Sequence, residues 1–235
     1  MIATSRLDAL SARLPQAANS VRPVTQVAKA SERHGSRSSD YVVAGLLSAA
    51  AEDQYRNPDH RQTKRPGEAA LQNGDNSFLT TILIMDVVNS TGIAVKLGDA
   101  KWRDIVNCHD AAAMRTVNRF DGTLHKLLGD GFISTFRQPS DAIACAQAFQ
   151  EEAKGLSLSV RAGIHSGECL RTANGITGIA IAIAARVVNC TPGECIWVSS
   201  TVRELLIGSR PTFDMVGSRK LRGLPDEWVL YQVID

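Results

Sequence analysis

One apolar run constrains the fold of this chain more than any other feature. The residues from Phe78 to Val87 read FLTTILIMDV and are rich in β-branched side chains. A continuous apolar run of this kind is typical of a strand that is buried in the middle of a sheet. The run closes on a single carboxylate, so we expect a central strand that carries Asp86 at its end.

The segments that follow alternate between helical and extended patterns. Residues 99–120 repeat apolar positions at spacings of three and four, which predicts a long helix. Extended runs on both sides of Gly129-Asp130-Gly131 predict a hairpin, residues 140–154 predict a helix with Ser140 at its start, and residues 156–169 predict a strand. This order predicts an α+β fold, a ferredoxin-like βαββαβ sheet flanked by helices.

The hairpin tip holds the second carboxylate of interest. On spacing alone an ordinary turn explains Asp130 better than a binding role does, because Gly and Asp are common hairpin residues. In the ferredoxin-like arrangement, however, the end of the first strand lies beside the hairpin tip, so Asp86 faces Asp130. Two carboxylates brought together repel each other unless a cation lies between them. The pair therefore favours a divalent metal site.

A polar turn, VVNSTG, follows Asp86 and leads into a helix. Free backbone N–H groups and the dipole at a helix N-terminus suit a phosphate. Asn89, Ser90 and Thr91 are also ordinary N-cap residues, and this alternative would be preferred for the turn alone. A metal beside a phosphate-binding turn is the arrangement of phosphoryl-transfer enzymes.

The first 77 residues differ in character from the segment 78–235. They are rich in Ala, Ser, Arg, Gln and Asn, and Pro and Gly interrupt them. This composition predicts one or two short helices on flexible linkers, either a poorly ordered tail or a regulatory or dimer-supporting extension.

Net charge, the length of the apolar runs and the spacing of the cysteines argue against several classes of protein. The net charge of +2 gives no argument for binding nucleic acid, and no apolar run reaches the roughly 18 residues of a membrane span. The N-terminus lacks the apolar core of a secretory signal, so we expect a cytoplasmic protein. The five cysteines include no CxxC pair, which argues against a disulfide framework or a zinc site.

Five segments together resemble the class III nucleotidyl cyclase catalytic domain, specifically its bacterial soluble branch. They are ILIMDVVNSTGIAVKLGDAKWRDIVNCHD, HKLLGDGFISTF, VRAGIHSGEC, GIAIAIAARV and RKLRGLPDEWVLYQV. The resemblance covers residues 78–235 and implies that this segment is a cyclase catalytic domain. The implied function is an adenylate cyclase that converts ATP to 3',5'-cyclic AMP and pyrophosphate by two-metal catalysis at a homodimer interface.

The resemblance also implies roles for single residues. Asp86, Asp130 and the Val87 carbonyl hold two Mg²⁺ or Mn²⁺ ions per site. Lys126 reads the base and favours ATP over GTP, because an amine donates to the adenine ring nitrogen but meets the N1–H of guanine badly. Arg186 is the catalytic cation that contacts the triphosphate. Further substrate contacts are implied for Asn89, Ser90, Thr91, Gly129 and Arg222.

Two positions depart from the family pattern. Gly175 stands three residues before the motif glycine, where the family has Asp or Thr, and Ala182 stands in place of the Asn that steadies the ribose. A degenerate cyclase domain that binds nucleotide or dimerises as a regulatory module therefore stays an alternative. A guanylate cyclase or diguanylate-type synthase is a third, although Lys126 and the missing GGDEF-like signature count against it. His109 and His165 lie in helix and strand patterns and are expected to be structural.

Overall fold

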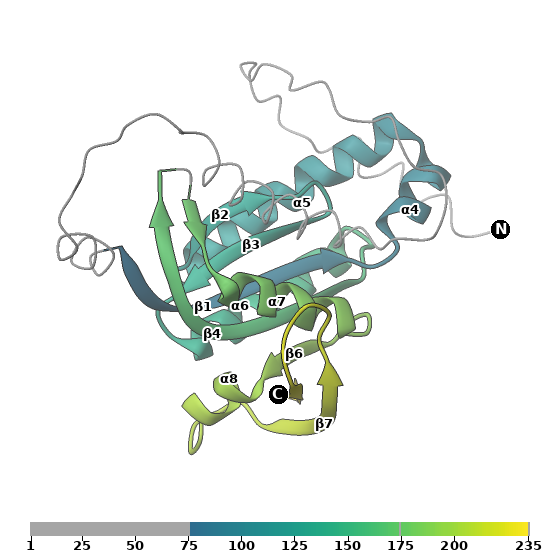
Figure 1. Cartoon of the computed structure of the whole chain (residues 1–235). Coiled ribbons are helices and arrows are strands. Elements are labelled where there is room, and N and C mark those ends of the chain that lie inside the picture. The colour runs from purple at the N-terminus through teal and green to yellow at the C-terminus, as the bar shows by residue number, and fades with distance from the viewer. Residues whose placement is uncertain (1–75, 174, 235) are drawn as a thin grey trace. The chain divides into compact units, whose positions relative to one another are not determined.

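The computed structural model describes residues 76–173 and 175–234. Figure 1 shows the elements, which are β1 (Ser77–Val87), α4 (Ser90–Leu97), α5 (Asp99–Arg119), β2 (Thr123–Leu127), β3 (Gly131–Phe136), α6 (Pro139–Gly155), β4 (Val160–Thr172), β5 (Gly175–Thr177), α7 (Ile179–Cys190), β6 (Ile196–Ser199), α8 (Ser200–Leu205), β7 (Phe213–Lys220) and β8 (Glu227–Val233). The extension expected over residues 1–77 lies outside the described residues except at its end, so that expectation stays a prediction.

The strands form one mixed sheet in the order β2-β3-β1-β4-β6-β8-β7, with β5 paired to the end of β4. β1 pairs antiparallel with both β3 and β4, whereas β4 pairs parallel with β6. The first four strands of the chain thus have the order 2-3-1-4 of a ferredoxin-like sheet, which confirms the predicted fold class. The last three strands of this order widen the sheet beyond that unit.

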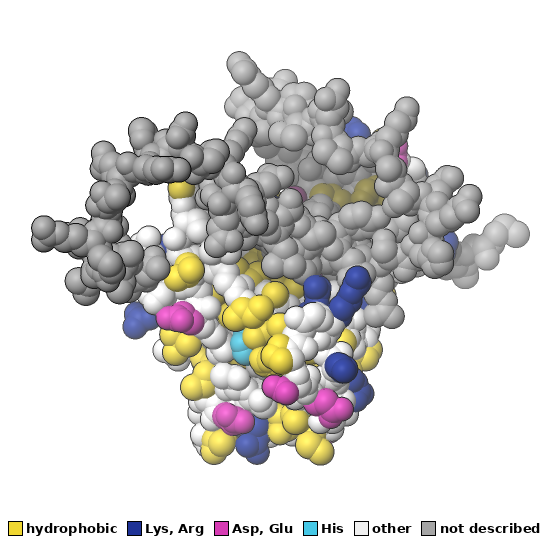
Figure 2. Space-filling model, viewed as in Figure 1, with side chains coloured by type: hydrophobic (Ala, Val, Ile, Leu, Met, Phe, Trp, Pro, Cys, Tyr) yellow, Lys and Arg dark blue, Asp and Glu magenta, His cyan; other side chains and the backbone are white. Residues whose placement is uncertain are grey.

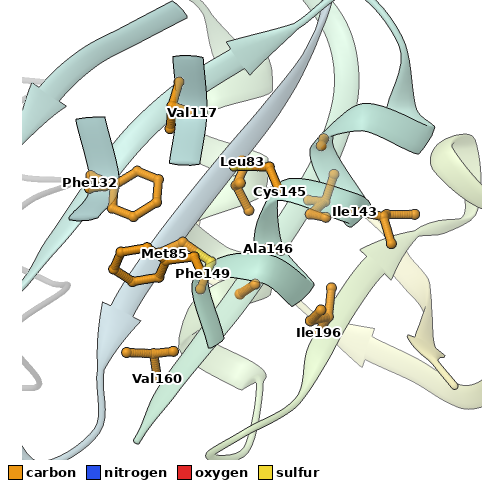
Figure 3. Packing of buried hydrophobic residues seen from close by; sticks show 14 of the residues in the cluster. Leu83, Met85, Val117, Phe132, Ile143, Cys145, Ala146, Phe149, Val160 and Ile196 are labelled. Carbon is orange, nitrogen blue, oxygen red and sulfur yellow. The ribbon is translucent and has the colours of Figure 1, made fainter. Parts of the chain in front are cut away.

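The apolar run of β1 is buried on both faces of the sheet. Leu83 and Met85 belong to a core that α5 and α6 cover, which Figure 3 shows from close by. Ile82 and Ile84 alternate to the opposite face and pack against α7. Burying each such side chain contributes roughly 1.5–3 kcal/mol, so β1 is firmly fixed and the position of Asp86 at its end is fixed with it.

Two glycines allow the close contacts that place the hairpin and α7. A Cβ at Gly131 would lie 2.2 Å from the Met85 carbonyl oxygen, and a Cβ at Gly163 would lie 2.3 Å from the backbone nitrogen of Val188. Neither position tolerates a side chain unless the backbone shifts. The hairpin therefore lies directly on β1, and α7 lies directly on β4.

The start of one helix differs from the sequence-based expectation. The second long helix begins at Pro139 with Gln138 as its N-cap, so Ser140 lies inside α6 rather than capping it. The five cysteines are free thiols in this structure, and of these Cys145 and Cys169 are buried. In the part of the chain that the structure describes, no helix is long and apolar enough to cross a membrane. Among the side chains coloured by type in Figure 2, basic, acidic and apolar ones are interspersed and neither charge dominates.

Candidate functional site

Asp86 lies near the end of β1, beside a charged partner, Arg161, on the neighbouring strand β4. Its side chain is 9% exposed and that of Arg161, its register partner on β4, is 14% exposed. Arg161 Nε donates a hydrogen bond to Asp86 Oδ2 at 2.9 Å, and Arg161 Nη2 donates to the same oxygen. Arg161 Nη1 also donates to the Thr191 carbonyl oxygen at 3.4 Å. The guanidinium thus ties the end of β1 to the residues that follow α7.

The pKa of Asp86 is raised above its ordinary value. Burial is the main cause, and the neighbouring Asp130 carboxylate adds to it, while the hydrogen bonds and charge of Arg161 act in the opposite direction. Because the net direction is upward, the guanidinium does not fully offset the cost of holding this carboxylate ionised. An additional cation near Asp86 would lower that cost.

Asp130 is held beside Asp86 by the hairpin and by α4. The backbone N–H of Val87 donates to the Asp130 carbonyl oxygen at 2.8 Å, and Gly131 is the register partner of Asp86. The hydroxyl of Ser90 donates to Asp130 Oδ2 at 2.6 Å. The structure therefore brings the two predicted carboxylates together, as the ferredoxin-like arrangement required.

The turn after β1 presents the start of α4 to these carboxylates. Asn89 is the N-cap in a left-handed conformation, with φ of 56° and ψ of 36°, and its side chain makes no capping hydrogen bond. The first backbone bond of the helix runs from Ile93 to the Asn89 carbonyl oxygen. The preceding N–H groups, including those of Ser90 and Thr91, have no partner inside the helix, which makes this turn suitable for an anion.

Two cavities meet at Ser90 and Thr91. One, of about 460 Å³, also contains Asp86 and Arg161 and extends to the loop at 189–193. The other, of about 550 Å³, lies between α4, α5 and the hairpin and contains Asp130. Each is large enough for part of a nucleotide. The further residues that line the 550 Å³ cavity are Ala94, Asp99, Trp102, Arg103, Val106, Leu128 and Gly129.

The other predicted site residues lie outside these two cavities. Lys126 is exposed on β2, and Gly175 begins β5 with φ of 133°. Ala182 and Arg186 lie on α7, one turn apart, and Arg186 Nε donates to the Arg222 carbonyl oxygen at 2.9 Å. The structure therefore joins Arg186 to Arg222, but a single chain does not bring this pair or Lys126 to the carboxylates.

The two histidines that could suggest a chemical role are both buried. His165 is buried, and its Nδ1 lies 2.7 Å from the Ser199 hydroxyl oxygen. Burial lowers the pKa of His165 to about 4, so it stays neutral near pH 7. His109 is buried against Phe132 and Phe149. The burial of both side chains fits the structural role that their sequence patterns predict.

Arg161 is the site residue that sequence reasoning missed. It is the second residue of the motif VRAGIHSGEC, and the signal was a charge in the otherwise apolar start of that motif, VRAGI. A buried arginine almost always has a partner. Identifying Asp86 as that partner requires the β1–β4 register, which no local pattern reveals.

The donor atoms at this site fit a hard divalent cation. Asp86, Asp130 and the backbone carbonyl of Val87 offer oxygen atoms, which Mg²⁺ and Mn²⁺ prefer. Among the described residues no cluster of three or more His, Cys, Asp or Glu side chains is found. Two carboxylates with further ligands from substrate phosphates are the usual set for Mg²⁺ in phosphoryl-transfer sites. The residues present therefore fit such an ion.

Comparison with curated proteins gives distant relatives. No protein-family model matches the chain. An uncharacterized protein of Rhizobium meliloti, R02095, is 26% identical over 183 residues, which are 68% of this chain and 18% of that protein. The serine/threonine-protein kinase pkn2 of Myxococcus xanthus is 22% identical over 176 residues, 70% of this chain and 21% of that protein. The chain thus spans about a fifth of the length of these two relatives.

Comparison with solved structures identifies the fold. The adenylyl cyclase CyaB from P. aeruginosa matches with a TM-score of 0.63 and 19% identity, covering 68% of this chain and 96% of that chain. The guanylyl cyclase Cya2 matches with a TM-score of 0.58 and 22% identity, covering 67% and 92%. The described domain therefore has the fold of class III adenylyl and guanylyl cyclase catalytic domains, as the sequence motifs suggested.

Proposed function

We propose that this protein is a class III adenylate cyclase, which converts ATP to 3',5'-cyclic AMP and pyrophosphate. The observation that carries the proposal is that Asp86 and Asp130, which are distant in sequence, meet beside the start of α4. Two adjacent carboxylates, one of them buried, are costly for a domain that binds no cation there. The fold shared with adenylyl and guanylyl cyclases supports the same conclusion.

The proposal assigns two Mg²⁺ or Mn²⁺ ions per site to Asp86, Asp130 and the Val87 carbonyl. Bound ions would lower the pKa of the ribose 3'-hydroxyl and offset phosphate charge. The chain itself keeps the two carboxylates in place. Arg161 hydrogen-bonds to Asp86, and Ser90 hydrogen-bonds to Asp130.

The first turn of α4 is the proposed site of the phosphates. The left-handed Asn89 turns the chain so that the N–H groups of Ser90 and Thr91 precede the first helical hydrogen bond. These groups would hold phosphate oxygens as the 3'-hydroxyl attacks the α-phosphorus and pyrophosphate leaves. Gly129 lines the adjoining cavity, which offers space for the nucleoside.

A homodimer completes the site in this proposal. The carboxylates would come from one subunit, and Lys126, Arg186 and Arg222 from the other. None of these three residues lines either cavity of its own chain, which supports this arrangement. Arg186 hydrogen-bonds to the backbone carbonyl of Arg222, so the two residues are neighbours, and in this proposal both would act on the same phosphates.

Substrate choice is proposed to rest on Lys126. A lysine amine donates to the adenine ring nitrogen, so ATP is favoured over GTP. Gly175 and Ala182 remove two contacts that the family pattern provides, and we expect slow turnover for that reason. Because ATP is the proposed substrate, the enzyme is proposed to act in the cytoplasm.

A second candidate function follows from Ala182. Its methyl group offers no hydrogen bond to a ribose, so the chain could be a degenerate cyclase that binds nucleotide or dimerises as a regulatory module. One measurement distinguishes the two candidate functions. It is the formation of cyclic AMP and cyclic GMP from ATP or GTP by the purified protein with Mn²⁺. Cyclic AMP well above the no-enzyme blank supports the cyclase. Product at the level of the blank supports the binding module.

A further inference from the structure

The carboxylate of Asp130 lies at a hairpin tip whose backbone alone does not fix where the side chain points. The Leu128 N–H donates to the Gly131 carbonyl oxygen at 2.8 Å and closes the tip. The Val87 N–H donates to the Asp130 carbonyl oxygen, also at 2.8 Å, and joins the tip to β1. The side chain of Asp130 still rotates about two bonds, each with more than one favoured angle. A contact made by the carboxylate itself is therefore needed to select one orientation.

Ser90 supplies that contact from the first turn of α4. Its hydroxyl donates to Asp130 Oδ2 at 2.6 Å, a distance typical of a hydroxyl that donates to an ionised carboxylate. Ser90 is only 6% exposed, so water competes little for this hydrogen bond. The backbone of Asp130 is thus held by β1 and the hairpin, and its carboxylate is held by α4.

The hydrogen bond to Asp130 also limits what else the Ser90 side chain can do. A serine hydroxyl has one proton, and here that proton is donated to the carboxylate. Phosphate oxygens accept hydrogen bonds, so the hydroxyl has no proton to offer a phosphate while it donates to Asp130. The substrate contact that the resemblance implies for Ser90 is therefore assigned to its backbone N–H, at the proposed phosphate site, and not to its side chain.

The same hydrogen bond leaves Asp130 able to bind a cation. An ionised carboxylate has about four lone-pair positions on its two oxygens, and the hydroxyl of Ser90 uses one of them. A carboxylate that is already oriented loses less freedom when a cation binds. In metal sites, removing a partner that orients a ligand typically lowers metal affinity by roughly 10–100-fold.

Ser90 lies at the boundary between the two cavities. It lines the 460 Å³ cavity, which contains Asp86, and also the 550 Å³ cavity, which contains Asp130. A cation that binds both carboxylates has to lie where the two cavities adjoin, close to Ser90. The hydroxyl is therefore placed where the orientation of Asp130 matters for such a cation.

We infer that Ser90 is a positioning residue for the cation site, and that its side chain acts through Asp130 rather than on the substrate. The hydroxyl holds one oxygen of the Asp130 carboxylate, so the carboxylate is oriented before the cation arrives. This inference rests on the proposed function, because it takes Asp86 and Asp130 as the cation ligands.

The test is equilibrium binding of Mn²⁺ to the purified full chain without nucleotide, measured by electron paramagnetic resonance of the free ion. Ser90→Ala removes the hydroxyl and should weaken Mn²⁺ binding about tenfold, at the lower end of the range for such partners. Ser90→Thr keeps a hydroxyl and should bind Mn²⁺ with close to the wild-type affinity. Calorimetry with α,β-methylene-ATP in EDTA should give the same nucleotide affinity for Ser90→Ala and the wild type.

A matched control removes a serine hydroxyl elsewhere in the domain. Ser140 lies at the start of α6, where its hydroxyl donates to the Gln138 side chain at 3.5 Å. Ser140→Ala should change neither the Mn²⁺ affinity nor the nucleotide affinity. Circular dichroism checks that each variant folds. If Ser90→Ala does not fold, Ser90→Cys takes its place, because a thiol has a similar shape but is a weak donor.

Weaker Mn²⁺ binding by Ser90→Ala that is recovered in Ser90→Thr supports the inference. Mn²⁺ binding by Ser90→Ala that equals or exceeds the wild type overturns it, and weaker nucleotide binding in EDTA would then make the side chain a substrate contact. A folded Ser90→Thr variant that binds Mn²⁺ as weakly as Ser90→Ala overturns it as well. Failure of the metal assignment itself is distinguishable, because Asp130→Asn then binds Mn²⁺ as well as the wild type.

Discussion

Arg161→Met should destabilise the domain, because it leaves the buried Asp86 carboxylate without its cation. The two side chains are 14% and 9% exposed, and breaking a buried ion pair by removing one partner costs about 3–5 kcal/mol. Asp86 also lines a cavity that water can enter, so we expect the lower end, about 3 kcal/mol. In a domain of this size that loss corresponds to roughly 6–12 °C in Tm.

The loss should depend on pH in a defined direction. The pKa of Asp86 is already raised by burial, and removing Arg161, which lowers it, raises it further. A carboxyl whose pKa is higher in the folded state binds more protons when folded, so its stability contribution is present at low pH and is lost as pH rises through the folded pKa. The deficit of Arg161→Met should therefore be small near the ordinary carboxyl pKa and largest above the raised one.

Urea unfolding in EDTA, followed by circular dichroism, measures both effects at about pH 4.5 and about pH 7.5. Arg115→Met is the matched control, because Arg115 and Glu152 are 64% and 47% exposed and such surface pairs contribute about 0–1 kcal/mol. If Arg161→Met loses no more stability than this control at the higher pH, or loses the same amount at both, the reasoning about the buried pair is refuted.

Two further substitutions test the residues that read the nucleotide. Lys126→Glu should depress ATP turnover, because a carboxylate presents an acceptor to an acceptor nitrogen of adenine, and unchanged turnover would make Lys126 an ordinary surface residue. Ala182→Asn should raise kcat by roughly tenfold, with less effect on KM, if it restores a ribose hydrogen bond that is strongest near the transition state. A wild type that turns over rapidly and an Ala182→Asn variant that is slower would show that another residue holds the ribose.

The central part of the fold could be predicted from sequence because its signals are local. The apolar run of β1 and the glycines around Asp130 specify a strand and a hairpin without reference to the rest of the chain. The ferredoxin-like order then places Asp86 beside Asp130. The partners of these carboxylates could not be predicted in the same way. Arg161 reaches Asp86 through the β1–β4 register, and Ser90, expected at the substrate, donates to Asp130.

The outer part of the sheet was less predictable. β6 pairs parallel with β4, and β8 then pairs antiparallel with β6 and with β7. The β7–β8 pairing also shifts register between Met215 and Gly217. The pairings of β6 with β4 and with β8 join segments that are far apart in sequence and depend on the whole sheet, so short patterns do not specify them.

The central claim is that carboxylates of one subunit and arginines of the other form one cyclase site. Mixing two inactive variants, Asp130→Asn and Arg186→Ala, tests it most directly. Each variant alone should make no cyclic AMP from ATP with Mn²⁺, whereas an equimolar mixture, after subunit exchange, should recover about a quarter of the wild-type rate. Half of the dimers are then mixed, and each mixed dimer has one intact site of two. A mixture as inactive as its components, at a protein concentration where dimers form, would contradict the account.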